Sequence, residues 1–507
     1  MKTRFSIVLF LFLAVQLSAQ VHIALPENGE WSGQALKEYI GQTVVFDMPM
    51  IVCGNTSGNY TVSPWRRFQP ECMGEVGSPE YNETVRINST CMFALADVSG
   101  YHRCGEKIYN LKAKVNSTSS LTMISGTWRG NTRAELEAGL PDLGDYRLLV
   151  CGFNLENYYM TWGSMGARSY AEHQDQRAKI SAALKKINAD IFGLVELQQG
   201  DEAVIEIVDD LNKNLHNRNY RFFHDAAAGT FQKVDFVYDA NKVEPIGTPT
   251  ETNVEVQNRK KMLCFREIET GEKFIYSINH FKAMNTGGAD RRENEAKAVV
   301  TLYNSYRRHP NIAENDVLIM GDLNCYAKTA PIMVFTETND MIDLHRAFHA
   351  DSSYSYMFGG QASYIDHAIS NETLYRQITG MAGYHINSDE DDYYTYERSG
   401  DRTMFRCSDH DPVLVGLKLD STLSNPIVPF INNKDVLTLE NNKMVIQNAY
   451  SPEKKSFYAV YTVSGLLQER KEITSSYFEV PLPVTPGIYI VYLYFEGEVY
   501  PQRLIVR

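Results

Sequence analysis

The sequence lacks a long hydrophobic run after its first 20 residues, and it lacks an excess of basic side chains. No later stretch is long enough to cross a bilayer as a helix, so we expect the mature chain to be soluble. Lys and Arg number 49 against 62 Asp and Glu, a net charge of −13 that excludes a protein coating polyanions through bulk positive charge. Tandem repeats and low-complexity tracts are also missing. The 507 residues, 44% apolar and 22% charged, therefore indicate a globular chain of two to four domains, neither disordered nor collagen-like.

The acidic excess is concentrated in the middle of the chain. Residues 145–418 hold 29 Lys and Arg against 40 Asp and Glu, a net charge of −11. Part of it is the run from Asp389 to Asp392, for which we predict a solvated loop. An enzyme whose carboxylates hold divalent cations is compatible with this charge, because the metal then faces an anionic substrate.

The first 20 residues have the pattern of a secretory signal peptide. Lys2 and Arg4 precede an apolar run over residues 5–15, and a cleavage zone with the small residues Ser18 and Ala19 follows at 17–20. A membrane anchor is the weaker alternative because the run is short, and no Cys near the cleavage zone supports lipid attachment. We expect residues 1–20 to direct export, which places the protein outside the cell, at its surface or in the periplasm.

The eight cysteines include no CxxC pair, so a zinc cluster is the weaker hypothesis. Four of them lie in the first quarter of the chain, where an exported protein could form two disulfides in any of three pairings. These four are Cys53, Cys72, Cys91 and Cys104. We expect the other four, Cys151, Cys264, Cys325 and Cys407, to be buried thiols.

Composition separates three regions after the signal peptide. Residues 21–140 contain short β-rich runs split by turn residues, which predict a small barrel or sandwich. Residues 145–418 alternate strand and helix patterns, typical of a layered α/β or α+β domain. Residues 425–507 again show only strand patterns.

Continuous apolar runs predict the strands of the middle region. They lie at 147–153, 191–197, 236–238, 274–278, 317–320 and 413–417. Between the first two, Ser169 and Glu172 predict a capping box at the start of a helix. Apolar spacing predicts two further helices. One is expected to bury Val204, Ile205, Val208, Leu211 and Leu215, and the other Ala296, Val299, Val300 and Tyr303.

Several of these strands end in polar residues that a buried strand has no packing reason to carry. The segments are Asn154–Glu156, Glu196, Asn279–Lys282, Gly321–Asn324, Ile365–His367 and Ser408–Asp411. One such residue alone is commonly a turn or helix cap. Six segments in one region are better explained by a shared cleft, because strand ends on one side of a sheet converge in space.

The order Asn, Glu, His, Gly-Asp-x-Asn, Ile-Asp-His, Ser-Asp-His-x-Pro-Val resembles that of the endonuclease/exonuclease/phosphatase superfamily over residues 145–418. The resemblance implies a four-layer α/β (α+β) sandwich of the deoxyribonuclease-I-like type. Within this superfamily, four further segments resemble the secreted bacterial extracellular nucleases. These are 188–196, 279–282, 354–361 and 385–390.

The resemblance extends to the flanking regions. In those nucleases an OB-like domain commonly precedes the catalytic one, which implies an all-β OB-like domain at 21–140. The segments Pro486–Val491 and Leu504–Arg507 resemble the β-sandwich sorting domains of type IX secretion, which implies such a domain at 425–507.

The resemblance also implies metal ligands. Glu196 is expected to be the principal Mg²⁺ ligand, with Asn154 beside it and Asp409 as a further ligand. Carboxylate and amide oxygens suit a hard cation. Mn²⁺ is an alternative metal, and Ca²⁺ a structural one. For Glu156 two roles are equally open: direct binding of the metal, or contact with the residues that bind it.

The remaining candidate residues act on the phosphate or the attacking water. Asp322 matches the residue that orients and deprotonates water, and Asn324 would hydrogen-bond water or phosphate. His410 would contact the scissile phosphate, with Asp366 fixing its tautomer and favouring its charged form. His280 is a candidate acid or electrostatic stabiliser.

Other basic and imidazole groups carry weaker expectations. Lys282 is expected on the same face of an extended strand as His280, where it could contact phosphate. Arg259 could also contact phosphate, although a solvated loop is favoured for 259–261. We expect His367 to be structural. His385 and Asp389 fit the nuclease pattern without an assigned mechanism.

The leading prediction is a secreted, metal-dependent phosphodiesterase that cuts DNA, and RNA as a further substrate, as a sugar-nonspecific endonuclease. We expect a monomer whose partner is nucleic acid, chiefly DNA, without stable membrane insertion, exported through its signal peptide and C-terminal region. One alternative is a phosphomonoesterase or a lipid or inositol phosphodiesterase of the same superfamily. The other is a catalytically silent surface binding protein.

Overall fold

The computed structural model divides the chain into two compact units, Met1–Ser424 and Asn425–Arg507, each taken here by itself. In the first it describes residues 20–24, 34–56, 58–90, 92–163, 165–225, 229, 231–284, 288–398 and 400–420. In the second it describes 437–440, 443–447, 456–462, 467–475, 477–480, 487–495 and 498–506. No helix in these ranges is long and apolar enough to cross a membrane. The predicted signal peptide, apart from Gln20, lies outside them.

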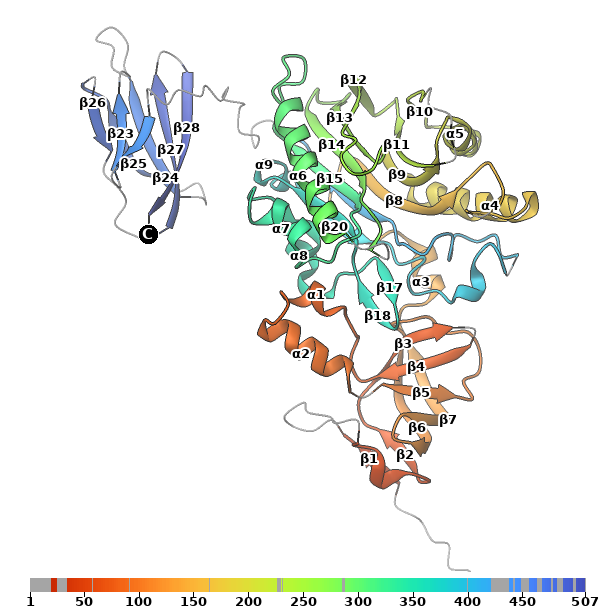
Figure 1. The fold of residues 1–507 in the computed structure, drawn as a ribbon. Coiled ribbons are helices and arrows are strands. Elements are labelled where there is room, and N and C mark those ends of the chain that lie inside the picture. Colours follow the sequence, from red (N-terminus) through yellow and green to blue (C-terminus); the bar gives the residue numbers. More distant parts are fainter. Residues whose placement is uncertain are drawn as a thin grey trace, which may run out of the picture. The chain divides into compact units, whose positions relative to one another are not determined.

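The N-terminal part of the first unit is a seven-stranded sheet in the order β1-β2-β6-β3-β4-β5-β7 (Figure 1). Because β6 also pairs with β7, the strands β3, β4, β5, β7 and β6 form a closed ring. The strands are β1 (Val21–Ile23), β2 (Thr43–Phe46), β3 (Met50–Thr56), β4 (Asn59–Ser63), β5 (Phe93–Ala96), β6 (Lys107–Ser117) and β7 (Ser120–Arg129). Their apolar side chains enclose a core of their own.

Helices accompany these strands, so the all-β composition predicted for residues 21–140 is wrong. They are η1 (Lys37–Tyr39), α1 (Pro70–Met73), α2 (Pro79–Asn88) and α3 (Arg133–Ala138). Helix α2 begins where the Ser78 side chain accepts a hydrogen bond from the Tyr81 backbone, with Pro79 in its first turn. Helix α3 begins with a full capping box between Thr132 and Glu135.

The middle part of the first unit contains two six-stranded sheets. The first, in spatial order, comprises β10 (Tyr220–Phe222), β11 (Gln232–Asp239), β9 (Ile191–Gln198), β8 (Leu148–Tyr158), β21 (Val413–Leu417) and β20 (Ile378–Gly383). The second comprises β12 (Val243–Glu251), β13 (Lys260–Glu267), β14 (Lys273–His280), β15 (Val317–Asp322), β19 (Asp366–Ser370) and β16 (Ile342–Asp343). A separate hairpin joins β17 (Tyr356–Phe358) to β18 (Gln361–Ser363).

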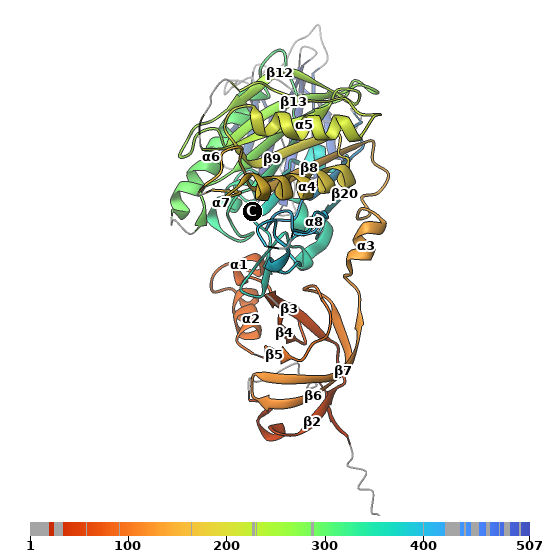
Figure 2. The ribbon, with the colours of Figure 1, turned by 90° about the vertical axis from the view of Figure 1, so that its right-hand side faces the viewer.

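Helices cover the outer face of each sheet. On the first sheet they are α4 (Tyr170–Ile187) and α5 (Glu202–Asn214), and on the second α6 (Ala289–Tyr306) and α7 (Ala330–Thr336). Helices α8 (Leu344–His349) and α9 (Glu372–Tyr375) contribute instead to the core between the sheets, and two short turns are η3 (Ala350–Ser352) and η4 (Asp392–Tyr394). Figure 2 shows α4 and α5 in front of β8 and β9. Their apolar residues share one core with the first sheet, while α6 and α7 share another with the second. A third core joins the two sheets, so the layer order is helix, sheet, sheet, helix. The α/β class predicted for this region is confirmed.

The second unit consists of strands over its described residues. One sheet contains β22 (Leu437–Glu440), β23 (Lys443–Gln447) and β26 (Tyr477–Val480). The other contains β25 (Leu467–Glu472), β24 (Phe457–Thr462), β27 (Gly487–Phe495) and β28 (Glu498–Val506).

The cysteines do not form the two disulfides considered for the first quarter of the chain. Cys53, Cys72 and Cys104 are buried free thiols, and Cys91 lies outside the described residues. Cys72 lies in a small cluster with Tyr364, away from the core that contains Cys104. Burial in apolar surroundings raises the pKa of Cys72 to about 12, which keeps its thiol protonated.

The acidic run at 389–392 is not the solvated loop that its charge predicted. Asp389, Glu390 and Asp391 are buried, and only Asp392 is exposed. Arg66 and Arg103 from the N-terminal part form ion pairs with the first two carboxylates. Burial of the run is therefore made possible by cations from a distant part of the sequence.

Helix α5 buries Val204, Val208 and Leu211 as its apolar spacing predicted, but the prediction for Ile205 is wrong. Ile207 is buried at 3% exposure, whereas Ile205, expected on the buried side, is 40% exposed. We expect Ile207→Ala to lower the free energy of unfolding by about 2–5 kcal/mol, because it leaves a cavity in the core. The matched change Ile205→Ala should cost no more than about 0.5 kcal/mol. Chemical unfolding of both variants checks this, and equal losses would contradict the orientation of α5.

Candidate functional site

Strand pairing brings the predicted polar residues to one edge of the two sheets. In the first sheet, β8 runs parallel to β9 with Asn154 opposite Val195, so Asn154 and Glu196 lie at the same end. In the second sheet, His280 pairs with Asp322 across parallel strands β14 and β15. Asp322 in turn pairs with Asp366 on β19.

His410 reaches the same edge from the segment before β21. That strand runs antiparallel to β8 with Val413 opposite Gly152, which places the residues just before it beside the end of β8. The Ser408 hydroxyl donates to the Asn154 backbone oxygen at 2.7 Å and fixes this approach. The convergence predicted from the strand ends is therefore present in the structure.

The side chains of the two sheets make direct contact. Asn154 Nδ2 donates to Asp322 Oδ2 at 3.1 Å, which bridges the sheets. His280 Nε2 lies 3.6 Å from Glu196 Oε1 and 3.7 Å from Asp322 Oδ2. His410 Nε2 lies 4.0 Å from Asp322 Oδ2. Asp322 is thus the centre of the group.

His410 and Asp366 form a buried pair. Their Nδ1 and Oδ2 atoms are 2.7 Å apart, and the Ser355 hydroxyl donates to the same carboxylate at 2.7 Å. Burial by itself would lower the pKa of His410, but Asp366, Asp409 and Asp322 raise it well above its ordinary value. The imidazole is consequently held in its charged form.

The other imidazole is held in the opposite state. Burial and the nearby Arg259 guanidinium lower the pKa of His280 well below its ordinary value. Its Nδ1 atom has no hydrogen-bond partner among the described residues. The edge therefore carries one charged and one neutral imidazole, about equally distant from the Asp322 carboxylate.

Asp322 is poised between its two protonation states near neutral pH. Burial raises its pKa to about 7, with Asp366 and Glu196 acting in the same direction and His410 opposing them. The Asn324 backbone N–H donates to its Oδ1 at 2.9 Å, and Asn324 Nδ2 lies 3.2 Å from its Oδ2. Both predicted residues of the Gly-Asp-x-Asn motif thus meet at one carboxylate.

A concentration of carboxylates makes the edge suited to a divalent cation. Ligand atoms of Glu196, His280 and Asp322 lie within 4.8 Å of one another. Burial, with the Asp409 charge, raises the pKa of Glu196 and raises that of Glu156 to about 8. The Glu156 Oε2 atom is buried and has no hydrogen-bond partner among the described residues. Several oxygen donors held this close together fit Mg²⁺ or a similar hard cation.

The backbone of the edge is strained at several residues of the group. Glu156, Asn157, Glu196 and Asn324 all have positive φ angles between 48° and 65°. Such conformations cost of the order of 1–3 kcal/mol each and persist where the surroundings impose them. Gly321 has φ 121°, and a Cβ atom there would lie 2.0 Å from the Asn279 backbone oxygen. The Gly before Asp322 is therefore required by the close approach of β14.

The remaining predicted residues are placed less centrally. Asp409 has a side chain 34% exposed and lies 3.9 Å from His410 Nε2, at the rim of the site. Arg259 is near enough to Glu196 and Asp322 for their charges to act on it. Strand β14 ends at His280, so the side-chain alternation of an extended strand, which predicted Lys282 on the same face as His280, does not extend to Lys282.

The solvated loop favoured for 259–261 is wrong. Lys260 and Lys261 begin strand β13 and are buried. Lys260 Nζ pairs with Glu295 of α6 at 2.9 Å. Lys260 therefore joins α6 to β13. His367 is also buried, with Nε2 2.8 Å from the Cys325 backbone oxygen, in agreement with the structural role expected for it.

Sequence reasoning did not assign roles to three residues of the site. Ser355 bonds Asp366, and the Tyr356 ring lies 4.9 Å from that of His410. Arg406 is a charged neighbour of Glu156 and Asp409. Ser355 and Tyr356 stand in a segment that resembles the nucleases, and this was the available signal. Arg406 precedes the Ser-Asp-His motif without a pattern of its own.

Comparison with known proteins agrees with this geometry. A family model described as "Endonuclease/Exonuclease/phosphatase family" matches residues 152–410, just over half of the chain. No curated protein matches the chain.

Solved structures with a similar fold include three that each cover 54% of this chain, with a TM-score of 0.38. One is an endonuclease/exonuclease/phosphatase family protein from Bacteroides thetaiotaomicron, 17% identical and covered to 97%. Another is the mannosyl-6-phosphatase Bt3783 of the same organism, 16% identical and covered to 100%. The third is the human Nocturnin catalytic domain with bound sulfate, 13% identical and covered to 94%.

The raised carboxylate pKa values predict a linked effect of pH and metal on stability. Asp322 and Glu156, with pKa values of about 7 and about 8, keep protons that the unfolded chain releases above about pH 4. The stability of the metal-free protein should therefore fall as pH rises from about 4 to about 8. Metal binding requires deprotonated carboxylates, so Mg²⁺ should raise Tm more at about pH 8 than at about pH 5.5.

Thermal unfolding with Mg²⁺ or with EDTA at both pH values measures this effect. Glu196→Gln, which removes one carboxylate charge, should abolish most of the increase in Tm. An increase of the same size at both pH values, or one unchanged in Glu196→Gln, would contradict the metal site.

Proposed function

Because the chain belongs to the endonuclease/exonuclease/phosphatase family, whose members are metal-dependent hydrolases of phosphoester bonds, we propose that it is a nuclease. Its substrate is DNA, with RNA as a further substrate, and it cuts within the strand without selecting the sugar. The observation that carries this proposal is the meeting of Asn154, Glu196, His280, Asp322 and His410 at one edge of the two sheets.

Each side chain has a role that follows from its charge state. Asp322, with a pKa near neutrality, orients the attacking water and accepts its proton. His410, kept charged by Asp366, stabilises the negative charge on the scissile phosphate. Asn324 holds the Asp322 carboxylate in position and can donate to water or phosphate. Neutral His280 is placed to donate a hydrogen bond to the same centre.

Glu196 and Asn154 would hold the metal, with Asp409 at the rim as a further ligand. Mg²⁺ is the cation we propose, with Mn²⁺ as a substitute. Such an ion supplies positive charge to a non-bridging phosphate oxygen. Without it, the buried carboxylates of this edge would repel a phosphodiester.

The choice of nucleic acid as substrate is supported by the segments that resemble secreted bacterial nucleases, and Arg259 adds a cation close to the site. The net charge of −11 over residues 145–418 means that few phosphates are neutralised away from the site. We therefore expect modest affinity with a shallow dependence on salt.

Export and the flanking regions belong to the same proposal. The signal-peptide pattern at 1–20 supports secretion of a monomeric enzyme to the cell surface or beyond. The closed ring of β3, β4, β5, β7 and β6 supports an OB-like domain before the catalytic one. The sheets of the second unit support a sorting-domain role for residues 425–507.

Cleavage of plasmid DNA tests the proposal directly. The wild type should nick supercoiled plasmid in Mg²⁺, and EDTA should abolish the activity. Glu196→Gln and His410→Ala should each lower turnover by about 10²–10⁴-fold, as expected for a lost metal ligand or a lost charged group at the phosphate.

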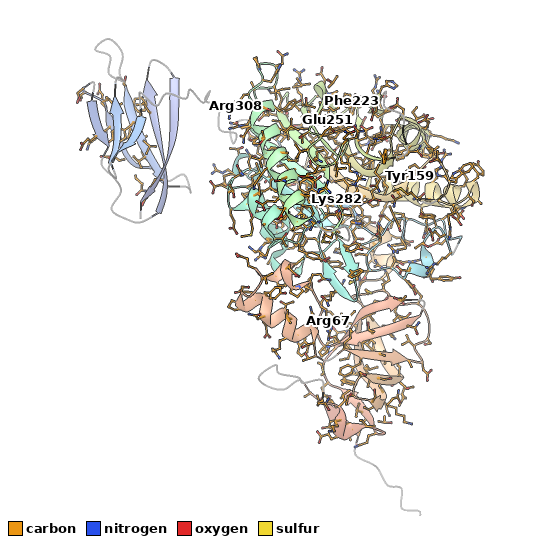
Figure 3. The ribbon with its side chains drawn as sticks, in the orientation of Figure 1. Arg67, Tyr159, Phe223, Glu251, Lys282 and Arg308 are labelled. Atoms are coloured by element: carbon orange, nitrogen blue, oxygen red, sulfur yellow. The ribbon has the colours of Figure 1, made fainter. Side chains whose placement is uncertain are left out.

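Matched substitutions outside the site provide the controls. Glu251→Gln changes an exposed residue of edge strand β12 (Figure 3), and His22→Ala an exposed residue of β1. Both variants should keep the wild-type rate. An intact plasmid combined with hydrolysis of a phosphomonoester or of sphingomyelin would replace the nuclease proposal by the corresponding activity. Inertness of the folded protein on all three substrates would support a binding protein.

A further inference from the structure

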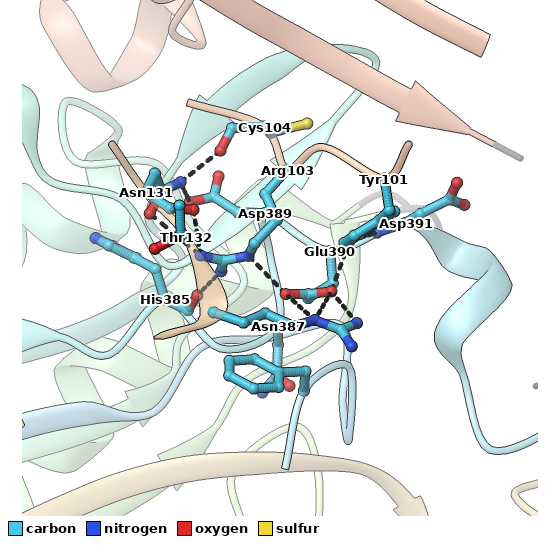
Figure 4. A network of polar contacts seen from close by, with 12 residues as sticks. Tyr101, Arg103, Cys104, Asn131, Thr132, His385, Asn387, Asp389, Glu390 and Asp391 are labelled. Atoms are coloured by element: carbon cyan, nitrogen blue, oxygen red, sulfur yellow. Dashed lines mark hydrogen bonds and ion pairs between the residues drawn. The ribbon is translucent and has the colours of Figure 1, made fainter. Parts of the chain in front are cut away.

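The buried acidic segment Asp389–Asp391 makes polar contacts with residues of the N-terminal part of the first unit (Figure 4). Asp389 Oδ1 accepts from Arg66 at 2.7 Å, and its Oδ2 accepts from Asn131 Nδ2 at 2.7 Å. Both partners come from the N-terminal part. The Tyr354 hydroxyl, from the segment before β17, donates to Asp389 Oδ2 at 2.8 Å. One fully buried carboxylate is thus shared between the two parts.

The neighbouring carboxylate repeats the arrangement. Arg103 and Arg133 both pair with Glu390 at 2.5 Å, and the Tyr101 hydroxyl donates to it at 2.6 Å. All three residues belong to the N-terminal part, while Glu390 belongs to the middle part. The interface is therefore a set of desolvated ion pairs, in which loss of one partner leaves a buried charge uncompensated.

Two routes lead from this interface to the catalytic imidazole. In the first, the Tyr354 ring stacks on His385 with centroids 3.8 Å apart and planes 3° apart, and Arg66 lies 4.3 Å from the Tyr354 centroid. His385 Nδ1 is 2.9 Å from Asp411 Oδ2, and Asp411 follows His410 in the chain. The Asp411 backbone N–H donates to the Ser355 oxygen at 2.8 Å.

The second route passes through the hairpin of β17 and β18. Ala362 of β18 accepts from the Gln69 N–H at 2.9 Å and donates to the Arg67 oxygen at 2.8 Å. Phe68, in the segment after Arg66, thus forms an isolated parallel bridge with Ala362 of the hairpin. The other strand of the hairpin begins at Tyr356, which pairs with His410 in an isolated bridge.

Ser355 lies between these routes and touches the catalytic pair itself. Its hydroxyl donates to Asp366, whose same oxygen bonds His410 Nδ1. A displacement of the 354–356 segment would therefore move both the carboxylate and the imidazole. Displacements of about 1 Å in a reacting group commonly cost about 10²-fold in rate.

We propose that Arg66 is a positioning residue for His410, acting through Asp389 and Tyr354, and that the N-terminal part is thereby a component of the catalytic unit. This inference rests on the proposed role of His410 but not on the identity of the substrate. In this proposal the N-terminal part affects the rate of turnover and is not needed for substrate binding.

The test compares full-length variants that differ at the interface. Arg66→Ala should lower kcat on plasmid DNA at least tenfold while KM stays within about twofold, because the imidazole is displaced and substrate contacts are kept. Arg66→Lys should recover part of kcat by restoring the charge. Arg86→Ala, which breaks the exposed Arg86–Glu83 pair of α2 in the same N-terminal part, is the matched control and should leave kcat unchanged.

A gentler variant covers the case in which Arg66→Ala fails to fold. Tyr354→Phe removes only the hydroxyl that bonds Asp389 and should lower kcat in the same direction. Where Arg66→Ala does fold, the double variant should lose less kcat than the sum of the two single effects, since both residues act through the contact with Asp389. Wild-type kcat in folded Arg66→Ala, or in Tyr354→Phe where Arg66→Ala does not fold, would overturn the proposal.

Hydrogen exchange separates this proposal from the nuclease assignment. Arg66→Ala should speed amide exchange in peptides that cover 354–356 and 408–411, and leave β9 protected as in the wild type. This readout needs no substrate, so it stands even where the wild type proves inactive on DNA. Unchanged exchange in both peptides would show that the N-terminal part does not hold the site.

Discussion

The repulsion between carboxylates buried at one edge of two sheets is the constraint on which the rest of the structure depends. Glu156, Glu196 and Asp322 all have raised pKa values because burial removes the water that would stabilise their charge. A fold tolerates such a cluster only where cations or protons compensate it. His410 supplies one compensating charge, and a divalent cation is the natural source of the rest.

The same principle governs the second group of buried acids. Asp389 is as deeply buried as Asp322, yet its pKa is lowered, because Arg66 and Arg103 outweigh the effect of burial. The arginines outweigh burial at Asp389, whereas His410 and Arg406 compensate the carboxylates of the sheet edge only in part. The contrast supports the proposed site independently of the sequence motifs.

Much of the site was predictable because its signals are local. Continuous apolar runs gave β9 and β15, and the polar residues after them, Glu196 and Asp322, stood out against that pattern. Parallel pairing of neighbouring strands then brings such residues together by geometry alone. The sequence likewise predicted the capping of α4 by Ser169. Only one of the two capping-box hydrogen bonds is present, the one from the Glu172 backbone N–H to the Ser169 side chain.

The rest depended on long-range contacts that a sequence does not display. The sequence pattern predicts a solvated Asp389, because its partner Arg66 lies 323 positions earlier in the chain. Ile205 and Ile207 fit an apolar helical face almost equally well, and only the packing of α5 on the sheet decides between them. That Cys53, Cys72 and Cys104 are free thiols depends on their three-dimensional geometry, which spacing in the sequence does not reveal.

The central claim is that Glu196, Asp322 and His410 surround one metal ion and one phosphate. A crystal of the protein with Mn²⁺ and a short oligodeoxynucleotide, examined by anomalous diffraction, tests it most directly. The account predicts an anomalous peak about 2.1 Å from a Glu196 carboxylate oxygen, with a phosphate within hydrogen-bonding distance of His410. A metal bound elsewhere with Glu196 unliganded, or a phosphate remote from His410, would contradict it.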